Sequence, residues 1–579
     1  MMRRAGTVAA VGTLALTGVV ASPAGADDGL ARFDRPQSGF MPPATVLEQA
    51  EPADAGLDPA RIEALTAAAA SYTEPAPGAD HPLYASSVVL AAHDGQIVAE
   101  DAAGWSLRYA DADGTPLPPD ERVAATTDTI YDLASVSKLF TTIVVLQQVE
   151  AGLIDLDAPV ADYLPQFAAN GKQDITVRQL LTHTSGLVSW LPLWREPSNQ
   201  ARFDAVMNAT PEAEPGTAYE YSDLNMITAG WVAEEVTGRG LAELVREGIT
   251  DPLGMDDTGY NPAPELLPRI AATEFQAVPD RGMVHGEVHD ENAWSFGGVA
   301  GHAGVFGTVD DLARLAQAIL NGGAYDGARI LDRATVEAML TNENEAFPGN
   351  DHGLGFELNQ RWFMDALSSP STAGHTGYTG TSMVIDLQSR SFVILLTNRV
   401  HPSRDWGSIN PARRDVAHEL AYALAVAPRS GDTSWAAADG GSATSTLDLP
   451  VRLQGTSTVT FDLFADTEST DLLSLQISTD DGESWEPVPF TARHGDERIE
   501  ADDGVVSGYH GRHWWPARAE LPGVSGDAVL RWTYTTDPLY EGRGVHVDDV
   551  KVRTRGLPTF HGEKHPEAFT ADGWSLVAR

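Results

Sequence analysis

The 579-residue chain contains no cysteine. This excludes disulfide bonds, thiolate metal sites, a cysteine nucleophile and a lipid-modified cysteine anchor. Basic residues are scarce, since 38 Lys and Arg oppose 82 Asp and Glu for a formal charge of −44. So negative a surface repels phosphate groups, which disfavours nucleic-acid binding and electrostatic docking on anionic membranes. Only four residues are lysines, so a lysine within a motif is informative.

Residues 1–26 have the pattern of a secretory signal peptide. The chain starts with the basic stretch Met1–Arg4, an apolar run reaches about Val20, and Ala24–Ala26 supplies small residues for cleavage. The run is short and ends in Ser22-Pro23, which argues against a membrane anchor. We therefore expect a secreted, extracellular protein that is cleaved near Ala26 and does not insert into a membrane.

The hydrophobic fraction of 42% predicts more than one packed core, and residues 27–430 contain the first. Hairpin signals occur near both ends of this region, at Ser87–Val98 and Ser382–Thr397, and Asp94-Gly95 supplies the positive φ angles of a tight turn. A helix-rich centre lies between them, and a closing helix is expected over Ala412–Ala425. These signals predict an α/β fold in which helices flank an antiparallel sheet and a helical subdomain is inserted.

The rest of the chain has a different periodicity. Residues 431–445 are rich in Gly, Ala, Ser and Asp, which is typical of a linker and predicts few contacts across it, so that residues 27–430 fold alone. Apolar residues alternate with polar ones over 446–556, for example at Val459, Phe461 and Leu463, which predicts an all-β sandwich. Residues 557–579 are expected to form a loosely attached tail.

Ser135 and Lys138 are the first candidates for chemistry. They lie three residues apart at the start of a predicted helix, so their side chains share one face. An amine beside a hydroxyl can remove its proton, and a helix N-terminus favours the developing negative charge. Alone the pair is weak evidence, because a solvated polar helix start has the same pattern. The apolar run Phe140–Val149 that follows argues against solvation.

Two further motifs follow in order along the chain, Tyr221-Ser222-Asp223 and His375-Thr376-Gly377. Together with Ser135-x-x-Lys138, they resemble the three motifs of the serine β-lactamase and penicillin-binding-protein superfamily, in particular the group of class C β-lactamases, D,D-peptidases and related esterases. The segments Leu180–Leu187 and Gly301–Gly304 match as well. The resemblance covers residues 45–425 and implies a β-lactamase/transpeptidase-like fold.

The resemblance also implies a role for each motif residue. Ser135 is the expected nucleophile, and Lys138 and Tyr221 are the general-base pair. The backbone N–H groups of Ser135 and Tyr378 are expected to form the oxyanion hole. His375 is expected to orient the substrate or Tyr221. The expected substrate-binding residues are Asp223, Asn225, Thr376 and Gly377. No cofactor and no metal are expected.

Two residues depart from the motifs of the superfamily. Asp223 replaces an Asn, and an ionised carboxylate cannot donate a hydrogen bond to a substrate carbonyl. Asp223 either pairs with Lys138 and keeps it protonated, or faces elsewhere, in which case Asn225 takes the orienting position. His375 replaces a Lys, as in D,D-peptidases and esterases with a His-Thr-Gly motif. Both changes disfavour efficient β-lactamase activity.

We therefore expect a serine hydrolase that forms an acyl-enzyme with an ester or a D-amino-acid peptide, as a D-Ala-D-Ala carboxypeptidase does, on a small-molecule or peptidoglycan-type substrate. A weak β-lactamase is one alternative. A catalytically relict cell-wall or glycan-binding protein is another. The C-terminal region, with Ser478–Trp485, resembles jelly-roll modules of secreted bacterial hydrolases, which implies contact with a cell surface or glycan.

Overall fold

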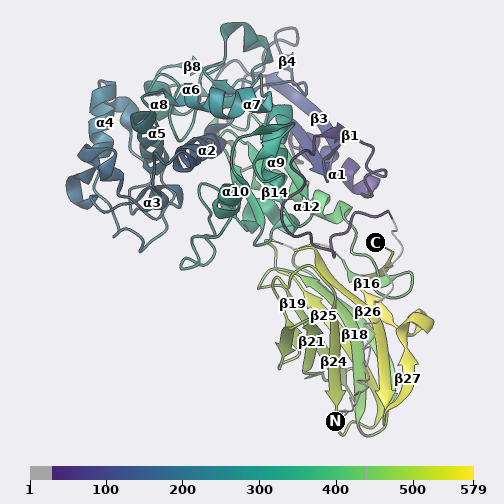
Figure 1. Cartoon of the computed structure of the whole chain (residues 1–579). Coiled ribbons are helices and arrows are strands. Elements are labelled where there is room, and N and C mark those ends of the chain that lie inside the picture. The colour runs from purple at the N-terminus through teal and green to yellow at the C-terminus, as the bar shows by residue number, and fades with distance from the viewer. Residues whose placement is uncertain (1–28, 439, 541, 579) are drawn as a thin grey trace, which may run out of the picture.

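The computed structural model describes residues 29–438, 440–540 and 542–578, and the predicted signal peptide lies outside them. An α/β body is followed by a β-sandwich body (Figure 1), which confirms the predicted fold class. Among the described residues, no helix combines the length and apolar character needed to cross a membrane.

A mixed sheet forms the centre of the α/β body. The strand order is β1 (Glu48–Gln49), β3 (Gln96–Leu107), β2 (Ser86–His93), β15 (Ser391–Thr397), β14 (Ser382–Asp386), β13 (Thr372–Thr376) and β12 (Glu357–Leu358). Both predicted hairpins, β2–β3 and β14–β15, are antiparallel pairs. The turn between β2 and β3 has positive φ at Asp94 and Gly95, as the Asp-Gly pair predicts.

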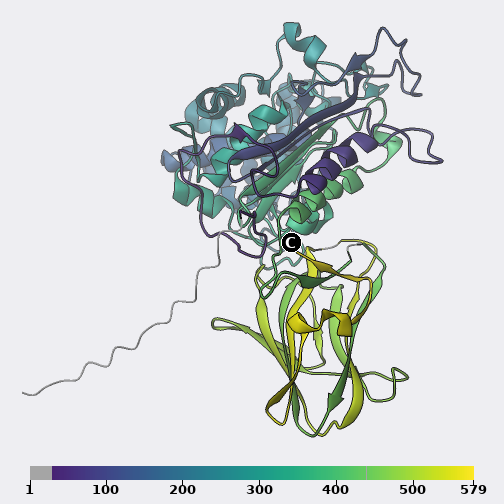
Figure 2. The same cartoon turned by 90° about the vertical axis from the view of Figure 1, so that its right-hand side faces the viewer.

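Alternate residues of the central strands face two separate cores. Val88 and Leu90 of β2 pack with α2 (Ser137–Glu150) and α9 (Val309–Leu320). Val89 and Ala91 pack with α1 (Pro59–Ser71) and α12 (Asn410–Ala423), which lie side by side on the other face (Figure 2). Strands buried on both faces read as continuous apolar runs, because a period of two then places apolar residues on each side.

The inserted helical subdomain lies beside the sheet and covers one end of α2 (Figure 1). It is built around α5 (Asp223–Thr237), which packs on α2. The shorter helices around it are α3 (Val177–Leu181), α4 (Asn199–Met207), α6 (Leu241–Val245) and α8 (Glu291–Ser295). The start of α5 therefore faces the start of α2, and this junction positions the second motif against the first.

The sandwich is larger than the sequence predicts. One sheet has the order β22 (Glu497–Ala501), β21 (Phe490–His494), β24 (Trp515–Leu521), β18 (Ser457–Asp466), β26 (Gly544–Thr554), β16 (Ser434–Ala437) and β29 (Trp574–Val577), with β27 (Leu557–His561) also on β26. The other has β20 (Glu486–Pro487), β19 (Leu472–Ser478), β25 (Gly526–Thr535), β17 (Thr444–Leu453) and β28 (Thr570–Asp572), with β23 (Val505–Val506) also on β19.

Two domain boundaries therefore need correction. The predicted linker contains β16, which pairs with β26 and β29. The predicted loose tail contains β27, β28 and β29, which pair with β26, β17 and β16. These strands are short, so alternation over a few residues gives no clear signal, and their partners come from distant parts of the sequence.

The expectation that few contacts join the two bodies is wrong. Arg512 of the sandwich is buried, and its Nη1 donates to Asp386 Oδ2 of β14 at 2.6 Å and its Nη2 to the Leu367 carbonyl at 2.6 Å. Its Nε donates to Asp466 Oδ2 within the sandwich at 3.2 Å. Trp514 packs in the same core as α1 and α12. The sandwich is thus fixed to the α/β body through a buried ion network.

Candidate active site

The chain makes a strained turn immediately before Ser135. Ala134 has φ of 47°, a left-handed conformation that costs a non-glycine residue about 1 kcal/mol or more. The buried Asp132 holds this turn, because its Oδ1 accepts the N–H of Ala134 at 2.9 Å and its Oδ2 the N–H of His289 at 2.6 Å. Thr381 Oγ1 donates to the Leu133 carbonyl at 2.9 Å. The turn thereby presents Ser135 at the start of α2.

Lys138 lies one helical turn beyond Ser135 and is buried, as the apolar run predicts. Its Nζ donates to Ser135 Oγ at 2.8 Å and lies 2.8 Å from Asp223 Oδ1. Burial lowers the pKa of Lys138, but the Asp223 carboxylate and the Tyr221 hydroxyl outweigh burial and raise it above its usual value. Of the two alternatives for Asp223, the structure places it against Lys138.

Tyr221 is held beside Lys138 by the segment around His183. Lys138 Nζ lies 4.7 Å from the centre of the Tyr221 ring, and the His183 ring centre lies 4.6 Å from it. His183 Nδ1 accepts the N–H of Ser222 at 3.1 Å, which fixes the start of α5. Burial raises the pKa of Tyr221, and the charge of Lys138 opposes part of that rise. The three residues of the predicted nucleophile and base pair are therefore assembled.

The predicted substrate contact of Asn225 is wrong. Asn225 is fully buried, its Oδ1 accepts from Ser185 Oγ at 2.6 Å, and its Nδ2 lies 3.1 Å from His183 Nδ1. Since α5 begins at Asp223, Asn225 lies a further 200° around the helix and points into the subdomain. Its amide holds the loop that supports Tyr221.

The third motif divides between the cleft and the core. Thr376 and Gly377 line the cleft, and their contact with substrate stays a prediction. His375 is only 1% exposed, and its Nδ1 lies 2.8 Å from the Thr376 carbonyl oxygen. Burial and the charge of Lys138 lower the pKa of His375 to about 3, so the ring is neutral at physiological pH. The ring centre of His375 lies 6.1 Å from that of Tyr221, and its orienting role stays a prediction.

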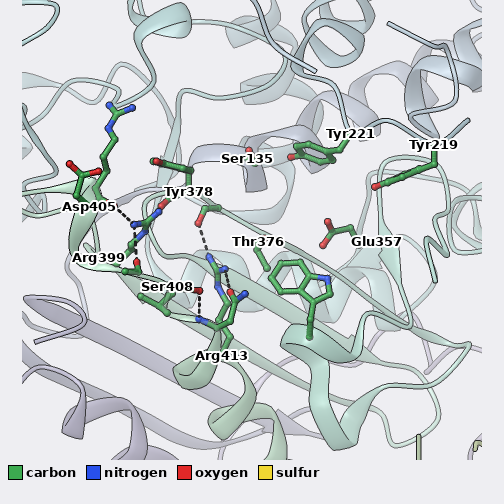
Figure 3. A pocket seen from close by; sticks show the side chains of 16 residues that line it. Ser135, Tyr219, Tyr221, Glu357, Thr376, Tyr378, Arg399, Asp405, Ser408 and Arg413 are labelled. Atoms are coloured by element: carbon green, nitrogen blue, oxygen red, sulfur yellow. Dashed lines mark hydrogen bonds between the residues drawn. The ribbon is translucent and has the colours of Figure 1, made fainter. Parts of the chain in front are cut away.

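A cleft of about 610 Å³ opens in front of Ser135 (Figure 3). Tyr221, Thr376 and Tyr378 line it, and Tyr378 is 49% exposed. A side chain at Gly377 would collide with Thr381 Oγ1 and the Leu133 carbonyl, so the strand passes the nucleophile turn at backbone distance. The N–H groups of Ser135 and Tyr378 border this space, and their role as an oxyanion hole stays a prediction.

Sequence reasoning missed the charged groups of the cleft, which are Glu357, Arg399, Arg404, Asp405 and Arg413. Arg404 is paired with Glu274 and with Glu291. Within the described parts of the chain, Arg399 and Arg413 have no carboxylate within 4.0 Å. Burial and the charge of Arg399 lower the pKa of Arg413 to about 9. No motif marks these positions. Glu357 lies in β12 and Arg413 in α12, and the other three lie between β15 and α12.

One group near Lys138 has the composition of a metal site. Asp223, Asp290 and His302 bring ligand atoms within 4.8 Å of one another. However, Asp223 already faces the Lys138 ammonium, and Asp290 Oδ1 lies 2.8 Å from His302 Nε2. Burial would raise the pKa of Asp290, but His302 lowers it below its usual range. The carboxylates thus have cationic or hydrogen-bonding partners from the protein itself.

Residues 78–418 match the family model described as Beta-lactamase. The chain belongs to this family. A protein of Escherichia coli (strain K12) named "Putative D-alanyl-D-alanine carboxypeptidase" is 35% identical over 354 residues, which are 55% of this chain and 79% of that protein. A protein of the same name from Salmonella agona (strain SL483) is 33% identical over 57% of this chain and 82% of its own length. The chain is thus a serine hydrolase, as the motifs predict.

Solved structures of similar fold include a penicillin-binding protein homologue from Caulobacter crescentus, which is 22% identical with a TM-score of 0.49 and covers 64% of this chain and 99% of that one. A family VIII carboxylesterase is 24% identical with a TM-score of 0.47 and covers 63% of this chain and 97% of its own.

Proposed function

We propose that this hydrolase is a D,D-carboxypeptidase-type enzyme that removes a C-terminal D-amino acid from peptidoglycan-type peptides. The observation that carries the proposal is the guanidinium group of Arg399, which lies in the same cleft as Ser135. A free C-terminal carboxylate is the substrate group that supplies its missing counter-charge. The names of the curated relatives support the same substrate class.

The chemistry follows from the contacts of Ser135. Its Oγ attacks the scissile carbonyl while the Lys138–Tyr221 pair receives the proton, and the leaving amine takes that proton when the peptide bond breaks. Because Asp223 holds Lys138 as an ammonium ion at 2.8 Å, the pair must lose one proton before it can act as a base. Water then attacks the acyl-enzyme with the same pair as base, which releases the shortened peptide.

The test is the release of D-alanine from N-acetyl-D-alanyl-D-alanine by the purified protein. We expect release from the D,D-peptide, and at least tenfold lower kcat/KM for the C-terminal amide and for the peptide ending in L-alanine. Replacing Arg399 by Met should lower the ratio of kcat/KM for the acid over the amide, since a charge-assisted hydrogen bond is worth about 1.5–3 kcal/mol. Equal rates on the acid and the amide would reject carboxylate recognition.

Ester hydrolysis is a second candidate, and the Lys138–Asp223 contact favours it. An ester is an easier acyl donor than an amide, so it tolerates the absence of a side-chain donor at position 223.

We also propose that the sandwich contacts a cell surface or glycan and that the protein is exported. The basic, apolar and small-residue segments of residues 1–26 support export. Amino-terminal sequencing of protein recovered from the medium tests whether the protein is exported and where it is cleaved.

Asp223→Asn separates the two substrate classes. The Asn side chain adds a donor for a substrate carbonyl, so we expect the ratio of kcat/KM for D-peptide over ester to rise about tenfold, the equivalent of one hydrogen bond of about 1.4 kcal/mol. Measuring both substrates on one preparation cancels differences in folded fraction. An unchanged ratio would mean that residue 223 does not approach the substrate carbonyl.

The same variant should shift the pH profile. Asp223 raises the pKa of Lys138, so the wild-type amine becomes neutral only at alkaline pH and activity on an ester should rise as pH increases. Without the carboxylate, only the Tyr221 hydroxyl still opposes the effect of burial, so the pKa of Lys138 falls. We expect the rising limb of kcat/KM to move to lower pH in Asp223→Asn. If the rising limb of kcat/KM stays at the wild-type pH, the protonation of a group other than Lys138 limits the reaction.

A further inference from the structure

The carboxylate of Glu357, the first residue of β12, takes no part in the proposed acylation and deacylation steps. Glu357 lines the cleft, and its carboxylate points into it beside Tyr219 (Figure 3). Across the described chain, Glu357 Oε2 is buried with no hydrogen-bond donor, and no cation lies within 4.0 Å of the carboxylate. A buried carboxylate without a partner is costly, so this end of the cleft is incomplete without a ligand.

The cationic side chains nearest to Glu357 are committed elsewhere. Arg413 Nη2 donates to the carbonyls of Gly377 at 2.7 Å and Thr381 at 3.1 Å, and its Nη1 donates to Asn410 Oδ1 at 3.0 Å. Lys138 is held by Ser135 and Asp223. Neither group can turn to Glu357 without breaking the contacts that shape the catalytic turn.

The aromatic rings of Tyr219 and Trp362 line the same cleft as Glu357. Aromatic faces attract cations, and an acid in a cleft with two aromatic rings is a combination that binds ammonium groups. We propose that Glu357 binds a primary ammonium group of the substrate and makes the enzyme selective for peptides with a lysine-like side chain. The inference rests on the proposed function, since it names the class of peptide that the same site accepts.

The charge of Glu357 gives the proposal a pH signature. Burial raises the pKa of Glu357 to about 7, against the opposing charges of Arg413 and Lys138. The other groups facing it keep one state between pH 6 and 8: His352 has its pKa lowered to about 4, Tyr219 has its pKa raised, Lys138 has its pKa raised, and Arg413 titrates at about 9. Selectivity for a cationic side chain should therefore grow as Glu357 ionises between pH 6 and 8.

The experiment uses two matched pairs of peptides, because the amine can lie on either residue of the scissile bond. N-acetyl-D-alanyl-D-lysine is compared with N-acetyl-D-alanyl-D-norleucine, and N-acetyl-D-lysyl-D-alanine with N-acetyl-D-norleucyl-D-alanine. Binding to the full-length Ser135→Ala protein is measured by calorimetry at pH 6 and pH 8, and kcat/KM is measured on the wild type. Glu357→Gln is the test variant, and Asp405→Asn removes an acid from the same cleft as the control.

We expect the lysine peptide of one pair to bind at least tenfold more tightly at pH 8, with a smaller preference at pH 6. Glu357→Gln should reduce the preference below threefold at both pH values, and Asp405→Asn should retain it. No preference in either pair, or a preference that survives Glu357→Gln, overturns the inference. Lysine-selective binding without turnover by the wild type would support the inference and reject the proposed function instead.

Discussion

Ser135→Ala should lower kcat on esters and D-peptides by about 10⁴- to 10⁶-fold, because it removes the atom that forms the covalent bond. The Ser135 hydroxyl is the one that Lys138 Nζ contacts at 2.8 Å. Intact-mass spectrometry after incubation with a penicillin or a fluorophosphonate should show one adduct on the wild type and none on the variant.

Ser408→Ala is the matched control, since Ser408 also presents a hydroxyl to the cleft. The Ser408→Ala protein should still form the adduct, and both variants should have a melting temperature within a few degrees of the wild type. An adduct on Ser135→Ala would show that another residue is the nucleophile. A large drop in melting temperature would mean that the loss of activity reports unfolding rather than chemistry.

Arg512→Met should lower the free energy of unfolding by about 3–5 kcal/mol, the range for removing one partner of a buried ion pair. The substitution leaves the carboxylates of Asp386 and Asp466 without their cation, and both are at most 1% exposed. It also removes one of two donors to the Leu367 carbonyl, which keeps the hydrogen bond from the Thr372 hydroxyl. Urea unfolding followed by tryptophan fluorescence measures the loss.

Arg518→Met provides the contrast, because Arg518 pairs with Glu520 at 2.9 Å on an exposed strand face. Removing that pair should change the unfolding free energy by less than about 1 kcal/mol. A chain cut after residue 430 should be poorly soluble or inactive, since it loses Arg512 but keeps Asp386. A truncated protein as active as the full chain would show that the ion network contributes nothing to the catalytic body.

The sequence predicts the parts of this molecule that local patterns control. The two hairpins, the buried helix after Ser135 and the contact between Ser135 and Lys138 all follow from the spacing of apolar residues or from helix geometry over one turn. The order of the three motifs identifies the family before any coordinate is known. In each case the deciding residues are close in sequence, so the pattern contains the information.

The features that sequence reasoning missed depend on residues that are far apart in the chain. Arg512 lies 126 positions from Asp386, and nothing in either segment indicates the other. Glu357 reads as an ordinary strand acid until β12 pairs beside β13 and brings it into the cleft. The predicted substrate contact of Asn225 is wrong for a local reason, because the start of α5 at Asp223 turns the Asn225 side chain away from the cleft.

The packing of Gly377 restricts how this enzyme can be diversified. A side chain there would collide with the carbonyl of Leu133, two residues before the nucleophile, so any replacement displaces the turn that carries Ser135. A mutant library that varies Gly377 should therefore yield damaged proteins rather than new specificities. Positions that touch the same cleft from separate elements, such as Glu357 and Arg399, can vary without moving that turn, and selections for altered substrate range should begin there.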